Sequence, residues 1–195
     1  NALTDTGYYY TDAVLLAKFA KLTGRDDDHK MYSELAKEIK AAFNRRFYRG
    51  DGIYGKGEMT AMACALYQGL ADETEKTAVV RALVKAVNDC DLRPEFGILG
   101  AKYIPRALAE NGQLELAYRL LTHPGSLWMH WLGQGATTFW ENWYGDSSHN
   151  HIMFGDISAW SYQYLAGITP DPEYPGFSRL LLKPAPVKEL DSFSA

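Results

Sequence analysis

Apolar residues recur at steps of three and four through most of the first 122 residues, and this spacing is the pattern of amphipathic helices. The clearest case is residues 26–47, which begin with three aspartates and end near two arginines. These charges suit the two ends of a helix dipole. One apolar stripe runs along this predicted helix: Met31, Leu35, Ile39, Ala42 and Phe43.

The same spacing predicts further helices, over residues 9–23, 73–89, 98–111, 113–122 and about 150–167, with a short apolar segment at 59–70. The apolar residues of the helix predicted at 9–23 are Val14, Leu15, Leu16, Phe19 and Leu22. Those expected to face inward in the helix predicted at 73–89 are Val79, Val80, Leu83, Val84 and Val87. The glycine-rich stretch from Gly50 to Gly57 is predicted as a loop. Asn111-Gly112 lies between helical patterns, so we interpret it as a helix C-cap rather than a hairpin turn.

Helices therefore follow one another with short connections, and no alternation of strands and helices indicates a doubly wound sheet. The sequence predicts an all-α fold, either a bundle or part of a toroid of antiparallel helix pairs. After Gly167 the pattern changes, because the prolines between Thr169 and Gly176 indicate an extended linker. Arg179 to Lys183 is predicted as a strand for which no partner is evident, so we place a domain boundary between residues 1–170 and 171–195.

Composition narrows the classes of partner. The net charge of −4 argues against nucleic acid or an anionic membrane as the partner. No apolar run is long enough to span a membrane. Cys64 and Cys90 lack the spacing of a metal site, and we interpret both as buried thiols. The sequence leaves a periplasmic, secreted or cytoplasmic location open.

Candidate chemistry gathers in residues 135–151, which connect two helical regions and carry few helix formers. Glu141 stands between Trp140 and Trp143. Burial among aromatic rings would raise the pKa of this carboxyl and suit it to act as a general acid or base near neutral pH. Indole rings are also suitable platforms for sugar rings. The structural alternative is a helix-terminal glutamate paired with an arginine, with both tryptophans in the core.

Two further features of this segment leave alternatives open. His149 and His151 flank one residue, as in some metal sites, but only Asp146 or Asp156 is available as a third ligand. We therefore favour a hydrogen-bonding histidine and predict no metal. Hydrolysis of a glycosidic bond usually needs a second carboxylate. The candidates are Asp5, Asp12, Glu58, Glu95 and Asp146, and none has a context comparable to that of Glu141.

The stretch Gly-Ala-Thr-Thr-Phe-Trp-Glu-Asn-Trp, from Gly135 to Trp143, resembles the signature of family 78 glycoside hydrolases, the α-L-rhamnosidases. The resemblance continues in order along nearly the whole chain. Its other parts are Tyr8 to Asp12, Phe43 to Phe47, Phe96 to Lys102, Asn150-His151, Gly155, Trp160, Tyr162, Leu165 to Pro170, Pro175 to Phe177 and Pro184 to Pro186.

The resemblance implies an (α/α)6 barrel followed by a β-sandwich, and inverting hydrolysis of terminal α-L-rhamnosides without a cofactor. It assigns Glu141 as the general base, His151 as a substrate contact, and Trp128 to a segment that brings an aromatic ring to the sugar pocket. Trp140 and Trp143 are expected to bind the sugar as well. The family's acid motif lies upstream of the position that corresponds to Asn1, so we expect the general acid to lie outside this chain.

Besides the missing acid motif, the chain departs from the family in the length of one loop, and it is too short for a complete barrel. Only nine residues separate Glu141 from His151, where the family often has more, and the predicted helices are fewer than a complete barrel needs. A partial barrel would expose apolar helix faces, so we expect a fragment of a longer protein or a chain that self-associates. Two other functions stay open: an (α/α)6 glycosidase for another sugar, and a carbohydrate-binding or structural helical remnant.

Overall fold

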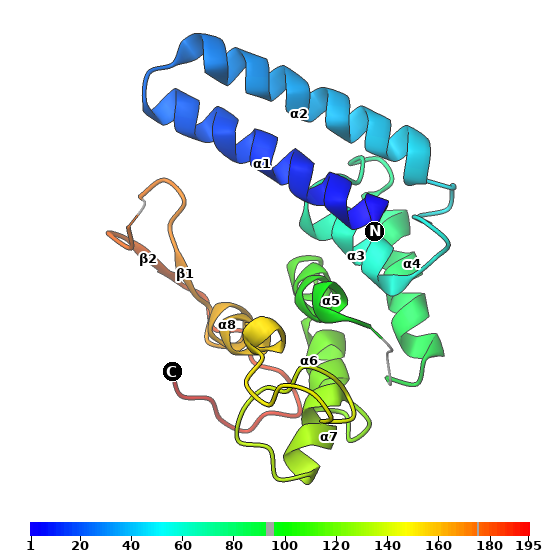
Figure 1. Cartoon of the computed structure of the whole chain (residues 1–195). Helices are drawn as coiled ribbons and strands as arrows, with labels where there is room; N and C mark the ends of the chain where they lie inside the picture. The colour runs from blue at the N-terminus through cyan, green and yellow to red at the C-terminus, as the bar shows by residue number, and fades with distance from the viewer. Residues whose placement is uncertain (93–95, 175) are drawn as a thin grey trace. The chain divides into compact units, whose positions relative to one another are not determined.

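The computed structural model describes residues 1–92, 96–174 and 176–195, and most of the chain is helical (Figure 1). The chain folds as two compact units, Asn1–Ala86 and Val87–Ala195. Within the described residues, no helix combines the length and the apolar character needed to cross a membrane.

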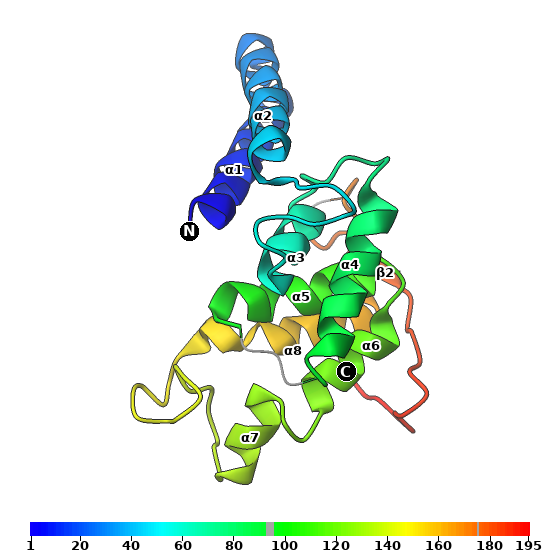
Figure 2. The ribbon, with the colours of Figure 1, turned by 90° about the vertical axis from the view of Figure 1, so that its right-hand side faces the viewer.

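The first unit is built on a pair of long helices that run side by side in Figures 1 and 2, α1 (Ala2–Leu22) and α2 (Asp26–Phe47). Gly24 stands in the turn between them with a φ of +70°, a conformation that glycine adopts without steric cost. The faces in contact are lined by small or apolar side chains, which let the two backbones approach closely. The buried residues of this contact are Ala13 of α1 and Ala36 and Ile39 of α2, against which Tyr10, Val14 and Leu35 pack.

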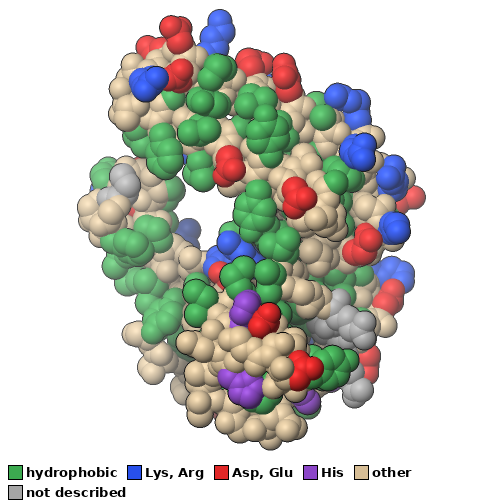
Figure 3. Space-filling model, in the orientation of Figure 1, with side chains coloured by type: hydrophobic (Ala, Val, Ile, Leu, Met, Phe, Trp, Pro, Cys, Tyr) green, Lys and Arg blue, Asp and Glu red, His purple; other side chains and the backbone are tan. Residues whose placement is uncertain are grey.

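The predicted apolar stripe of the first helix is placed differently from expectation. The helix begins at Ala2 rather than near residue 9, and its alanines form the face that packs on α2. The larger apolar residues Leu15, Leu16, Phe19 and Leu22 are exposed, and Figure 3 shows hydrophobic side chains gathered along this helix pair. Met31 and Ala42, expected within the stripe of α2, are exposed too.

The rest of the first unit contains two shorter helices, α3 (Met59–Tyr67) and α4 (Lys76–Asp89), and the second of these extends across the boundary at Ala86. The loop predicted at residues 50–57 is present. It requires glycine at Gly52, where a Cβ atom would lie 2.2 Å from the carbonyl oxygen of Ala78. Of the five α4 residues expected inward, Val79, Leu83 and Val87 are buried and Val80 and Val84 are half-buried.

The second unit contains the pair α5 (Ile98–Glu110) and α6 (Leu114–Thr122). Asn111 is the C-cap of α5 and Gly112 has a φ of +74°, so the predicted C-cap is confirmed. A short helix not predicted from the sequence, α7 (Leu127–Gly133), follows. The N-cap of α7 is Ser126, whose hydroxyl accepts a hydrogen bond from the Met129 amide at 3.3 Å.

The helix predicted near residues 150–167 is divided into three short pieces: η1 (Ile152–Phe154), α8 (Asp156–Trp160) and the π-helical turn η2 (Ser161–Leu165). Strand β1 (Ile168–Pro170) then pairs antiparallel with β2 (Leu180–Leu182). The expectation of an unpartnered strand is therefore wrong, because β1, its partner, includes Thr169 and Pro170 of the segment interpreted as a linker. This pairing spans residue 170, and the division into residues 1–170 and 171–195 stays a prediction.

Candidate active site

Glu141 lies in the loop that connects α7 to η1, and the two arms of this loop are joined by backbone hydrogen bonds. The His151 amide donates to the carbonyl of Phe139 at 2.7 Å, and the Glu141 amide donates to the carbonyl of Ser148 at 2.8 Å. The Thr138 hydroxyl donates to the His149 carbonyl. These bonds fold the loop back on itself, so residues on its return arm lie beside Glu141.

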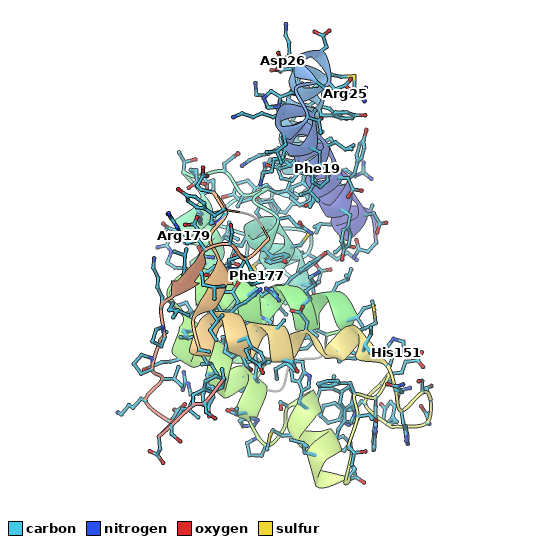
Figure 4. The ribbon with its side chains drawn as sticks, turned by 90° about the vertical axis from the view of Figure 1, so that its left-hand side faces the viewer. Phe19, Arg25, Asp26, His151, Phe177 and Arg179 are labelled. Carbon is cyan, nitrogen blue, oxygen red and sulfur yellow. The ribbon has the colours of Figure 1, made fainter. Side chains whose placement is uncertain are left out.

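The carboxylate of Glu141 is held through one of its two oxygens. The Ser148 amide donates a hydrogen bond to Oε2 at 3.2 Å, and Nδ1 of His151 lies 3.9 Å from the same oxygen. Among the residues that the structure describes, no group forms a hydrogen bond with the other oxygen, Oε1. The side chain is 45% exposed, so Oε1 is available to water or a ligand. Figure 4 shows His151 at the end of the chain segment that leads into α8.

The two tryptophans beside Glu141 do not bury it. Trp140 stacks on the ring of His149, with centroids 4.4 Å apart, and Trp143 stacks on His130 at the same distance. The predicted burial of the carboxylate between two indoles is therefore wrong for this chain, because each indole is paired with an imidazole. The alternative of an arginine partner is not found either, since the basic group recorded beside Glu141 within the described residues is His151.

The histidines of the loop serve as hydrogen-bonding and stacking groups. Nε2 of His149 lies 2.7 Å from the carbonyl oxygen of Gly145, while its ring covers Trp140. Within residues 1–92, 96–174 and 176–195, no group of three or more histidine, cysteine or acidic side chains could hold a metal ion. Figure 3 shows histidine and acidic side chains on one face of this part of the molecule.

The predicted sugar-binding tryptophans differ in exposure. Trp143 is 37% exposed and Trp140 is half-buried, whereas Trp128 is buried and its indole N–H donates to the carbonyl of Phe154 at 3.1 Å. The structure therefore brings Glu141, His151, Trp140 and Trp143 together on one loop. It places Trp128 in the core beneath, and the binding role predicted for Trp128 stays a prediction.

Asn142 is a residue of the site that the sequence analysis missed. Its side chain accepts hydrogen bonds from the amides of Tyr144 and Gly145, both at 3.0 Å. It also donates to Asp146 Oδ1 at 2.7 Å and to the Ser147 hydroxyl at 3.1 Å. The signal in the sequence was an asparagine placed before a glycine-containing turn, because asparagine side chains bond to backbone amides two residues onward.

Arg106 was missed as well, and it supports the far end of the loop. This arginine of α5 is 8% exposed and donates to both carboxylate oxygens of Asp156, from Nε at 2.7 Å and from a terminal nitrogen at 3.1 Å. It also donates to Gln163. Asp156 follows Gly155, where a Cβ atom would lie 3.2 Å from the ring of Phe139. An arginine within the apolar face of a predicted helix was the available signal.

The other acidic candidates are not placed like Glu141. Asp146 belongs to the same loop, but its carboxylate accepts the bond from Asn142. Asp5, Asp12 and Glu58 belong to the unit 1–86, where Asp5 pairs with the terminal amine and Glu58 accepts a bond from the Lys56 amide. Glu95 lies outside the described residues.

Comparison with known proteins identifies the family of the chain. The family model of the bacterial α-L-rhamnosidase six-hairpin glycosidase domain matches residues 1–165. An α-L-rhamnosidase of Formosa agariphila is 29% identical over 210 residues, which cover 100% of this chain and 22% of the relative. One from Alteromonas sp. is 30% identical over 199 residues, covering 94% and 21%. The chain thus spans about a fifth of the length of these relatives.

Solved structures show the same similarity. The α-L-rhamnosidase of Dictyoglumus thermophilum has a TM-score of 0.86 and 35% identity, over 94% of this chain and 21% of that one. The enzyme of Streptomyces avermitilis complexed with L-rhamnose has a TM-score of 0.84 and 28% identity, over 94% and 19%. These matches confirm the predicted fold class, the C-terminal portion of an (α/α)6 barrel with a short β segment. With the family model matched over residues 1–165, they show that the chain belongs to the bacterial α-L-rhamnosidase six-hairpin glycosidase domain family.

Proposed function

We propose that this chain forms part of an inverting glycosidase that hydrolyses terminal α-L-rhamnosides, and that Glu141 is its general base. The observation that carries the proposal is the asymmetry of this carboxylate. Oε2 is engaged by Ser148 and faces His151, while Oε1 is available in a half-exposed loop. This geometry suits a base, because one oxygen is held in place while the other is free to accept a proton from a water molecule within hydrogen-bond reach.

In the proposed reaction, Oε1 of Glu141 accepts a proton from a water molecule as that water attacks the anomeric carbon. The bond to the leaving oxygen breaks on the opposite face of the sugar, and the leaving oxygen takes a proton from a general acid. The Ser148 amide holds the other oxygen, Oε2, in place at 3.2 Å while Oε1 accepts the proton. The attack and departure on opposite faces invert the configuration of the anomeric carbon.

Rhamnose is the proposed sugar because the relatives are named α-L-rhamnosidases and one was solved with L-rhamnose. Trp143 offers the part of its indole that His130 leaves uncovered as an apolar platform for the sugar, with Trp140 and His151 beside it. Trp128, whose indole N–H donates to the carbonyl of Phe154, is proposed as a further aromatic residue of the sugar pocket.

The general acid is proposed to come from outside residues 1–195. Inverting glycosidases separate their two carboxyl groups by about 6.5–9.5 Å, which leaves room for the attacking water. The second acid of the Glu141 loop, Asp146, is occupied by its bond to Asn142. This arrangement supports an acid supplied by another segment.

Hydrolysis of p-nitrophenyl α-L-rhamnoside tests the proposal, measured with this chain and with a longer chain extended upstream. We expect turnover in the longer chain and its loss, by about 100-fold or more, in Glu141→Gln, which keeps the shape of the side chain. Glu115→Gln, on the exposed first turn of α6, is the matched control and should leave turnover unchanged. Undiminished turnover in Glu141→Gln would refute the role of the base, and turnover in the short chain would refute the external acid.

The engaged carboxylate of Asp146 also favours a second candidate, a carbohydrate-binding module without catalysis. This candidate predicts that L-rhamnose binds to the chain, as measured by calorimetry, with no hydrolysis in either length of chain. A panel of other nitrophenyl glycosides distinguishes a glycosidase for a different sugar, which would hydrolyse one of them and leave the rhamnoside intact.

A further inference from the structure

We propose that Asn142 is a positioning residue that fixes the orientation of the Glu141 carboxylate, an inference that rests on the proposed role of Glu141 as the base. Asn142 is the next residue in the chain. Its side chain uses both of its polar atoms in four hydrogen bonds, all to residues 144–147. These bonds define the turn that follows Glu141.

The backbone of Asn142 is held as firmly as its side chain. Its carbonyl accepts a hydrogen bond at 3.0 Å from the indole N–H of Trp131. Trp131 is 2% exposed and packs edge-to-face on Phe154, which is also buried. The residue beside Glu141 is thus attached to the core of its unit, and its side chain organises the turn from that fixed point.

The turn determines where the return arm of the loop lies. Residues 144–147, which Asn142 binds, lead directly into Ser148, whose amide holds Oε2 of Glu141 at 3.2 Å. Ser148 in turn accepts the Glu141 amide at 2.8 Å. When the side chain of Asn142 is removed, the turn loses four bonds, and Ser148 loses the restraint that keeps it beside the carboxylate.

Asparagine is specifically suited to this position because it both accepts and donates. Its oxygen accepts from two amides, and its nitrogen donates to the carboxylate of Asp146 at 2.7 Å. An aspartate would keep the first function and place a second negative charge against Asp146, close to Glu141. The carboxylates recorded around the turn are those of Glu141 and Asp146, so this added charge would meet two carboxylates.

Amide hydrogen exchange, followed by NMR on this chain, tests the inference without requiring turnover. We expect the amides of Ser148 and Glu141 to exchange about tenfold faster in Asn142→Ala and in Asn142→Asp than in the unmodified chain. The double change Asn142→Asp/Asp146→Asn reverses donor and acceptor across the same bond, and should restore protection to within about twofold. Asn111→Ala is the control, since that side chain bonds to the Ala107 carbonyl and lies outside the loop.

A purely structural role would give a different result. It would accelerate exchange across the whole unit 87–195 and lower the melting temperature, and the exchanged pair would not rescue Ser148 selectively. Unchanged exchange at Ser148 in Asn142→Ala, or failure of the exchanged pair to restore it, would overturn the inference.

Turnover provides the second measurement, in whichever length of chain hydrolyses the rhamnoside. Asn142→Ala is expected to lower kcat about tenfold with KM changed less than twofold, and the exchanged pair to recover most of the loss. If Ser148 responds as expected but neither chain hydrolyses a rhamnoside, the positioning role stands and the proposed function fails. If Ser148 does not respond, the positioning role fails while hydrolysis is judged separately.

Discussion

The ion pair between Arg106 and Asp156 gives the sharpest stability prediction. Arg106→Met removes two hydrogen bonds to Asp156 and one to Gln163, and it leaves a carboxylate without its partner. Removing one member of a buried pair costs about 3–5 kcal/mol. The side chain of Asp156 is 25% exposed and water recovers part of this loss, so we expect about 3 kcal/mol, at the lower end of that range.

The double-mutant cycle separates the pair from its surroundings. Asp156→Asn alone removes the charge that Asp156 presents to the guanidinium of Arg106 and should cost about 2 kcal/mol. In Arg106→Met/Asp156→Asn no buried charge remains, so the combined loss should fall short of the sum by about 2 kcal/mol. Arg179→Met is the matched control, because Arg179 is 55% exposed and lies 3.7 Å from Asp171. The Asp171 side chain is 13% exposed and Arg179 also lies over the ring of Tyr174, but because Arg179 itself is largely exposed its loss should cost no more than about 1 kcal/mol.

Urea unfolding followed by tryptophan fluorescence measures these changes in the free energy of unfolding for the unit that contains Arg106 and Asp156. All five tryptophans lie between Trp128 and Trp160, inside the unit 87–195 that contains the pair. Figure 4 shows Arg179 in the hairpin that carries the control. A cost below about 1 kcal/mol for Arg106→Met, or costs that simply add in the double variant, would refute the argument that this pair is a buried clamp.

Two further predictions concern packing and alkaline stability. A Cβ atom at Gly7 would lie 2.9 Å from Sγ of Cys64, so Gly7→Ala should lower the urea concentration at the midpoint of unfolding. Cys64→Ala should remove that effect when the urea-unfolding curves of the single and double variants are compared. Burial, and then the hydrogen bond to Glu110, raise the pKa of Tyr164 above its ordinary value of 10.0. The unfolded chain therefore loses this proton first, so stability declines as the pH rises above about 10, and Tyr164→Phe should reduce this decline in unfolding curves at increasing pH.

Helix positions followed closely from the sequence where the pattern was long and bounded by charge or glycine. The helix predicted at residues 26–47 is α2 with the same ends, and Asn111-Gly112 ends α5 as expected. The face that α1 buries was not predictable from hydrophobicity. Close packing against α2 favours small side chains on the contact face of α1, and the larger apolar residues of α1 are exposed. The pairing of β1 with β2 was hidden because Pro170 favours the interpretation as a linker.

The sequence placed the candidate chemistry on one loop but did not predict how the side chains of that loop are arranged. The motif from Gly135 to Trp143 identified Glu141, yet it suggested that the neighbouring indoles would bury the carboxylate. The histidine rings that stack on these indoles are His130, from α7, and His149, from the return arm of the loop. No local sequence pattern predicts this stacking. Asn142 and Arg106 were overlooked because polar residues in loops and helices are usually solvated. Only the tertiary structure shows their hydrogen bonds.

The bonds that hold the Glu141 loop have a consequence for the order of folding. Those that join its arms and its turn connect residues no more than twelve positions apart. Closing so short a segment costs little chain entropy, and local contacts of this kind form early. The clamp of Arg106 on Asp156 joins residues 50 positions apart and has to wait for α5 and α8 to meet. We therefore expect the geometry of the Glu141 loop to be assembled first and its attachment to the helical framework to be completed last.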